Sequence, residues 1–253
     1  MQFPRQYLYS REWREGVRHS VIILSNAIRR KARERLEAID GIRCAFQTQV
    51  LSAYLVSFGR RPAATITPGI VLDQEGIGTV KELLGGIGTP HAFDRYDVES
   101  GLYREVLVAK STKRLQKLRT AKVWSEPEIP ESALREGLAL GYPRNAAMAY
   151  ALEPWSRGLA HVQNIISAIE KGIEIPRFAA YLSHIPAAFD YERGAVSEPS
   201  MSMATSNMTF VMRSSPELDA RVVESFRKNI KDHLRKEAER SPGSGIPEIR
   251  IGT

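Results

Sequence analysis

Hydrophobic and polar residues recur with a helical period near both ends of the chain. Over residues 16–38, apolar side chains return every three or four positions, and a cluster of arginines and a lysine lies on the opposite side. Asp40-Gly41 is expected to end this helix. Over residues 216–240 a four-residue stripe follows Pro216, a residue favoured in a first helical turn. The pattern therefore predicts a long amphipathic helix near each end.

Between these helices, shorter apolar segments alternate with turn residues. Ser111 or Thr112 is expected to cap a helix that runs to about Lys122, with Leu115 and Leu118 facing inward. A second, brief helix over residues 80–84 is expected to begin at a Thr79 cap and to end at Gly85-Gly86. Residues 50–58 fit either a strand or a helix. The expected strands cover residues 42–47, 70–72, 91–96 and 103–110.

The chain changes character at residues 124–130, which contain two prolines and two acids. Three helices are expected beyond this point, at 131–140, 144–152 and 156–171, then a strand at 178–185, a mobile loop at 197–209 and an exposed tail from 241. We therefore predict two halves: 1–124, an α/β half with the N-terminal amphipathic helix, and 125–253, a mostly helical half. The expected fold class is α/β, with α+β as the alternative, and a mixed sheet with packed helices.

Length and composition fit one large domain or two of ordinary size. The chain has 253 residues, of which 43% are hydrophobic, enough to bury a sizeable core. It has no apolar run of transmembrane length and no recognisable secretory signal. Cys44 is the only cysteine, so an intramolecular disulfide and the ligand spacings of zinc fingers or iron–sulfur clusters are impossible. We expect a soluble cytoplasmic protein without cofactor, metal or membrane.

Charge is the strongest functional signal. The formal net charge is +7, from 36 lysines and arginines against 29 acids, and a basic surface attracts polyanions. Residues 106–125 contain no acid at all. The six cations of this segment are Lys110, Lys113, Arg114, Lys117, Arg119 and Lys122. Such a row suits the phosphates of a nucleic acid, although a solvated helix face is the common alternative.

Two further basic helical faces are interleaved with acids. They lie at residues 29–35 and 227–240. Ion pairs within each helix can neutralise part of their charge, so each is more typical of an ordinary exposed face.

An enzyme is the alternative of a different class. His184 precedes a proline and lies near Asp190 in sequence, so a loop there could place an acid or base beside an orienting carboxylate. With Tyr142 these residues would form a concave site. A histidine satisfied by backbone at the end of a strand is the commoner situation. The glycine pairs at 76–78 and 85–88 match no nucleotide-binding loop and fit turns instead.

Two motifs resemble one family. They are Leu140-Gly141-Tyr142-Pro143, which follows the strand Val-Leu-Val-Ala-Lys ending at Lys110, and the later His184-Ile185-Pro186 with Asp190. The segment 106–191 resembles the mainly archaeal, uncharacterised domain-of-unknown-function 483 family. The family's pattern places cysteines at four positions that are occupied here by Asn145, Ala146, Ala187 and Tyr191. The resemblance thus implies a scaffold that keeps its frame and lacks the thiolates of a metal or cluster site.

The leading prediction is therefore a non-enzymatic protein that binds RNA or associates with a ribonucleoprotein through the Lys110 to Lys122 surface. The alternatives are the enzyme described above and a structural subunit whose terminal helices dock on partner proteins.

Overall fold

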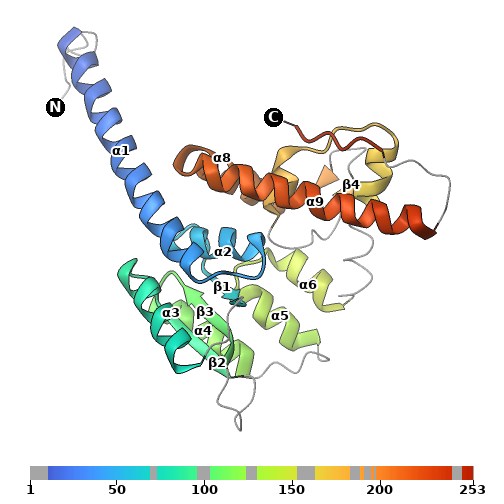
Figure 1. Cartoon of the computed structure of the whole chain (residues 1–253), viewed down its shortest axis with the longest axis horizontal. Helices are drawn as coiled ribbons and strands as arrows, with labels where there is room; N and C mark the ends of the chain where they lie inside the picture. Colours follow the sequence, from blue (N-terminus) through green and yellow to red (C-terminus); the bar gives the residue numbers. More distant parts are fainter. Residues whose placement is uncertain are drawn as a thin grey trace.

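The computed structural model combines many helices with a small sheet (Figure 1). It describes residues 11–68, 73–95, 103–123, 130–152, 163–182, 189–190, 195–196, 198–240 and 247–252. The three-stranded sheet is entirely antiparallel, so the expected mixed sheet is wrong and the architecture corresponds to the α+β alternative. None of the described helices combines the length and apolar character that crossing a membrane requires.

The sheet has the order β1-β3-β2, with β3 in the centre. Its strands are β1 (Ala63–Ile66), β2 (His91–Arg95) and β3 (Tyr103–Ala109). The pairing of β2 with β3 was predicted, and β1 comes from a short apolar segment between two prolines. Because side chains alternate along β3, Val106 and Val108 enter the largest core and Leu107 and Ala109 enter a core on the other face.

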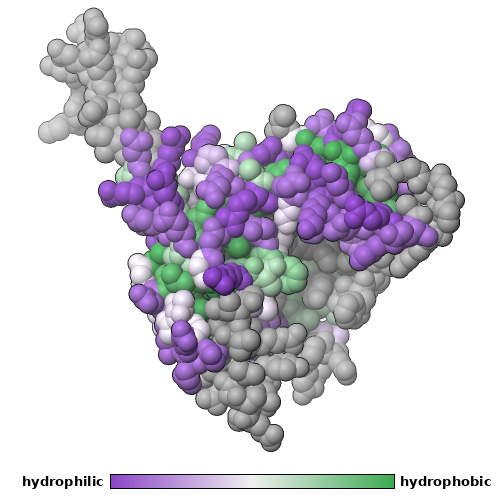
Figure 2. All heavy atoms as spheres, in the orientation of Figure 1, coloured by the Kyte–Doolittle hydropathy of each residue, from purple (hydrophilic) through white to green (hydrophobic). Residues whose placement is uncertain are grey.

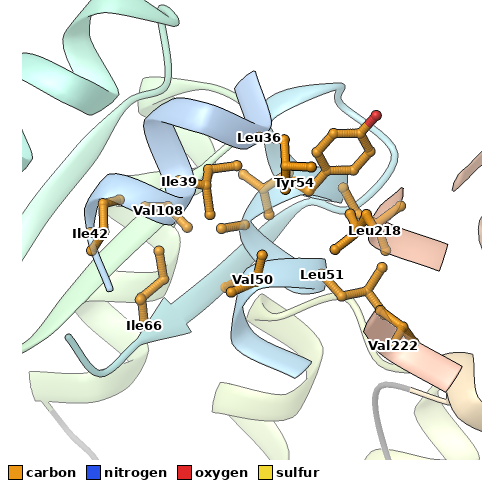
Figure 3. Close-up of a cluster of buried hydrophobic side chains, with 14 of the residues drawn as sticks. Leu36, Ile39, Ile42, Val50, Leu51, Tyr54, Ile66, Val108, Leu218 and Val222 are labelled. Atoms are coloured by element: carbon orange, nitrogen blue, oxygen red, sulfur yellow. The ribbon is translucent and has the colours of Figure 1, made fainter. Parts of the chain in front are cut away.

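Helices α1 (Arg11–Gly41) and α2 (Gln47–Ser57) cover the first face of the sheet. The end of α1 buries Leu36 and Ile39 beside Val50 and Tyr54 of α2 (Figure 3). The rest of α1 extends away from the body of the molecule (Figure 1). The predicted N-terminal helix is confirmed and is longer than expected, and residues 50–58, left open between strand and helix, lie mainly in α2.

The strand expected at residues 42–47 is wrong. This segment is a turn that buries Ile42, places Arg43 at a φ of 53° and leaves only an isolated bridge from Cys44 to Pro68. The adjacent helix α3 (Gln74–Gly86) begins at Asp73, whose carboxylate accepts a hydrogen bond from the Gly76 amide. The expected cap at Thr79 is therefore wrong as well. The strand expected at 70–72 lies outside the described residues.

Three helices follow the sheet: α4 (Thr112–Val123), α5 (Pro130–Ala139) and α6 (Arg144–Leu152). All three were predicted to within one or two residues. Leu115, Leu118 and Ala121 of α4 pack on the second face of the sheet together with Ala139 of α5. This packing determines which side of α4 remains outside.

The C-terminal part differs most from expectation. A helix at 163–170 leads to a 3-10 helix, η2 (Arg177–Tyr181), where a strand was expected. Helix α8 (Glu198–Ser214) replaces the expected loop, and α9 (Pro216–Arg240) has the predicted bounds. Two short strands, β4 (Phe189–Asp190) and β5 (Ala195–Val196), pair beside them. The described end of the tail is not free, because Ile251 bridges Ile175 in parallel.

The two predicted halves share their largest core. Leu218 and Val222 of α9 pack beside Leu51 and Tyr54 of α2 (Figure 3). The Tyr54 hydroxyl also donates a hydrogen bond of 2.9 Å to Ser214 at the end of α8. The C-terminal helices are therefore part of the body that supports the sheet and α4.

Candidate nucleic-acid interface

Helix α4 carries five of the six predicted cations, and its position is well defined. It begins after β3, where the Ser111 hydroxyl accepts a hydrogen bond from the Arg114 amide, so the predicted serine cap is confirmed. Leu118 is fully buried against the sheet and Leu115 is 9% exposed, as predicted. Because these residues fix the inner side of the helix, the remaining positions are directed outward or lie along its flanks.

Most of the predicted cations lie on the outside. Lys113 and Lys117, one turn apart, are exposed on the outer side of α4, and half-buried Arg114 borders them. Lys110 is exposed at the end of the strand that precedes the helix, and Arg119 is exposed on the opposite flank. We call this set the α4 basic face: Lys110, Lys113, Arg114, Lys117 and Arg119.

The α4 basic face has no neutralising partners in the described part of the chain. No described carboxylate lies within 4.0 Å of a nitrogen of these five side chains. Glu105 on β3 and Glu136 on α5 approach the helix, but both pair with Lys122 at its end and not with these five side chains. The charges of this face are therefore available to an external anion.

Lys122, predicted to belong to the same surface, faces the protein instead. Its ammonium group donates a hydrogen bond to Glu105 and lies 3.6 Å from Glu136, and its side chain is only 16% exposed. Burial alone would lower the pKa of this amine. The hydrogen bond to Glu105 and the charges of Glu136 and Asp94 outweigh burial, so its pKa is raised. Lys122 therefore holds α4 to the sheet and to α5.

The other two basic faces contain the expected internal ion pairs. On α9, Arg227 lies 2.6 Å from Glu224 and Arg235 lies 3.7 Å from Asp232. On α1, Arg30 lies 3.8 Å from Glu34. Part of their charge is thus neutralised locally, unlike that of the α4 basic face.

The structure does not give the mutual positions of Tyr142, His184 and Asp190, the residues of the predicted catalytic site. His184 lies outside the described residues, and Asp190 is described only as part of strand β4. Tyr142 is half-buried in the turn between α5 and α6, with the Arg61 guanidinium 5.1 Å from its ring centre. The proposed catalytic group therefore stays a prediction.

The positions of the family's first two cysteines lie at the start of α6. Asn145 is exposed and accepts a hydrogen bond from the Ala146 amide, and Ala146 is buried. Ala187 and Tyr191 lie outside the described residues. Within the described ranges, no three histidine, cysteine or acidic side chains are grouped closely enough to hold a metal ion.

Sequence reasoning did not anticipate a groove whose lining residues include Arg29, Arg60 and Arg213. Arg60 follows α2, and Arg213 lies in the segment next to the one expected to be a loop, so neither was part of a recognisable helical face. The signal was a run of small residues at helical spacing in α8, where Ser200, Ala204 and Val211 are almost fully buried.

Comparisons of this chain with models of protein families, with curated proteins and with solved structures found no significant match. The resemblance to the domain-of-unknown-function 483 family stays a prediction from short motifs.

Proposed function

We propose that this protein binds nucleic acid, with RNA as the expected class, through the α4 basic face, and that it acts as a binding protein rather than an enzyme. One observation supports the proposal most. Five cations of one helix and its preceding strand end lack any described carboxylate within salt-bridge distance, while the sixth is held by two.

The arrangement suits a phosphate backbone for an electrostatic reason. Each phosphate neutralised by a lysine or arginine releases condensed counterions, so binding free energy accumulates with the number of contacts. Lys113 and Lys117 are neighbours one turn apart, and Lys110 and Arg114 border them. Cations already paired within the protein would contribute less, which is why the faces of α1 and α9 are weaker candidates.

Charge reversal tests the proposal directly. The variant Lys113→Glu/Lys117→Glu, titrated with a fluorescently labelled twelve-nucleotide polyuridine in an anisotropy assay, should bind at least tenfold more weakly than the unaltered chain. The matched control is Lys228→Glu/Lys231→Glu, which makes the same change in net charge at two exposed positions of α9. Equal losses in both variants, or no loss in the first, would contradict a dedicated surface on α4. A DNA strand of the same length tests the preference for RNA.

The role of a structural subunit has support from one helix only. The apolar stripe of α9 is used inside the molecule, because Leu218, Val222 and Ile230 are buried in its own cores. Helix α1, in contrast, extends beyond the body (Figure 1) and is the element that a protein partner could reach. Protein partners are thus a second candidate, through α1.

A further inference from the structure

A groove between α1 and α8, formed by described residues, is a concave feature that the proposed function leaves unused. It measures about 1000 Å³, a volume within the range of small-molecule sites. Its cationic lining comes from three separate parts of the chain: Arg29 on α1, Arg60 after α2 and Arg213 on α8. No aspartate or glutamate is among its described lining residues. In Figure 2, hydrophilic residues dominate the face that α1, α8 and α9 present.

Arg60 is held in place before any ligand arrives. Its Nη2 donates to the Ser206 hydroxyl at 2.5 Å and to the Ser206 carbonyl at 3.3 Å, and its guanidinium lies 5.2 Å from the centre of the Phe210 ring. These contacts order a long side chain that would otherwise lose conformational entropy on binding. Arg29 and Arg213 are exposed and have no ion pair with a described residue.

A smaller groove beside it differs in the charges of its lining residues. It is lined by Arg29 and Arg33 together with Glu37, Asp40 and Glu217. Asp40 and Glu217 there pair with Arg221, at 2.7 Å and 3.8 Å respectively. Acids and bases are thus mixed in the smaller groove, whereas the lining of the larger one is cationic.

Hydroxyl groups add a second recognition element. Ser202, Thr205, Ser206 and Thr209 follow one another at helical spacing along the side of α8 that lines the groove. Thr209 donates its proton to the Thr205 carbonyl, and Ser206 receives Arg60, which leaves the Ser206 proton able to donate. Guanidinium groups and hydroxyl donors together are well suited to phosphate oxygens.

From these features we infer that the α1–α8 groove binds a phosphate group carried by an organic molecule. Three arginines match a group with two or more negative charges better than a single carboxylate. Ile28, Met201 and Met212 supply apolar surface in the same groove, where the organic part of a phosphate ester would pack. The ligand can be a free nucleotide or the 5′-phosphate of an RNA strand, which share this chemistry.

Calorimetric titration of the full chain tests the inference. Adenosine diphosphate should bind, and adenosine, which lacks the phosphates, should not. The variant Arg29→Gln/Arg213→Gln should weaken binding of the diphosphate at least tenfold. Arg30→Gln is a control for the loss of one charge on α1, because this exposed residue pairs with Glu34 and does not line the groove. All altered residues are exposed, so thermal unfolding of each variant should match that of the unaltered chain.

A second arm identifies the source of the phosphate. Hexauridine with and without a 5′-phosphate is titrated alongside the diphosphate into the Lys113→Glu/Lys117→Glu variant, because the α4 basic face of the unaltered chain is proposed to bind the strand whether or not it carries the phosphate. Binding of the diphosphate alone assigns a free nucleotide, and binding of only the phosphorylated strand assigns an RNA end. Equal affinity for adenosine and its diphosphate, no loss in the double variant, or no binding of any phosphorylated probe would overturn the inference. Because Lys113→Glu/Lys117→Glu leaves the groove intact, failure of the α4 interface would leave these results unchanged.

Discussion

Gly141 shows how one residue determines the approach of α5 and α6 to the sheet. Its φ of +86° is a conformation that L side chains rarely adopt. A Cβ at this position would lie 2.5 Å from two ring carbons of Pro62, the residue before β1. Both the turn and the close contact therefore require glycine in the Leu140-Gly141-Tyr142-Pro143 motif, which the sequence singled out without a structural reason.

Replacing Gly141 with alanine should lower the free energy of unfolding by on the order of 3 kcal/mol, since backbone strain and overpacking add. Chemical denaturation measures the change. Gly172→Ala is the control, because Gly172 also has a positive φ of 73°, but a Cβ there would meet no atom within 4 Å. A loss no larger than that of the control would show that the contact with Pro62 is unimportant.

Cys44 should be an unreactive thiol. Burial raises its pKa to about 12, compared with an ordinary value of 9.0. At pH 8 the thiolate fraction is then roughly one in ten thousand. Labelling of the folded protein by iodoacetamide should be slow and should rise about tenfold per pH unit between pH 7.5 and 9.5. A rate that levels off near pH 9, as expected of the unfolded chain, would disprove the effect of burial.

At the scale of the element, α4 has two sides with different functions. Its inner side and the Lys122 flank attach it to the sheet and to α5, and its outer side presents Lys113 and Lys117. Sequence spacing placed these cations on one helix but could not assign Lys122, because Glu105 and Glu136 come from other elements. Ion pairs between different helices and strands depend on the tertiary structure, and the spacing of residues along one helix does not predict them.

Lys122→Gln should therefore destabilise the protein, by about 1–3 kcal/mol, because it leaves two partly buried carboxylates without their cation. Lys113→Gln/Lys117→Gln should change the stability little, since exposed side chains without ion pairs are removed. Urea denaturation of the variants checks this difference. Equal stability of the Lys122 variant and the unaltered chain would show that the ion pairs are not needed for the fold.

The helices and strands differ in how well the sequence predicted them. Where a large apolar stripe or a paired strand was present, as in α4, α9 and the β2–β3 pair, the prediction was confirmed. Helix α8 was mistaken for a loop because its buried stripe consists largely of small or polar residues, among them Ser200, Ala204 and Asn207. Residues 178–181, the described start of the strand expected at 178–185, lie in a 3-10 helix, because apolar content alone does not separate a strand from a buried 3-10 turn.

At the scale of the whole molecule, the two predicted halves are joined by one core and by polar contacts. Arg221 of α9 donates two hydrogen bonds of 2.7 Å to the Asp40 carboxylate at the end of α1. This hydrogen bonding to Asp40 raises the pKa of Arg221. Within the second half, Tyr181 and Arg177 of η2 both donate to the buried Asp219 carboxylate of α9. These contacts bring segments about 40 to 180 residues apart into the body that supports α4.

The shared core predicts that the halves unfold together. Far-ultraviolet circular dichroism and tyrosine absorbance, to which Tyr54 and Tyr181 of the core contribute among the nine tyrosines, should give coincident urea transitions. Arg221→Ala should lower the free energy of unfolding by about 1–2 kcal/mol. Both transitions should therefore shift equally to lower urea concentration. Two separated transitions would instead support independent domains.

The central claim is that the outer cations of α4 contact nucleic-acid phosphates and that Lys122 does not. The salt dependence of binding to a single-stranded RNA between 50 and 200 mM salt tests it most directly. Each phosphate contact contributes roughly 0.7 to the slope of log affinity against log salt concentration. Lys113→Gln/Lys117→Gln should reduce the magnitude of the slope by about 1.4, while Lys122→Gln leaves it unchanged. An unchanged slope in the double variant, or an equal reduction per charge in the Lys122 variant, would contradict the account.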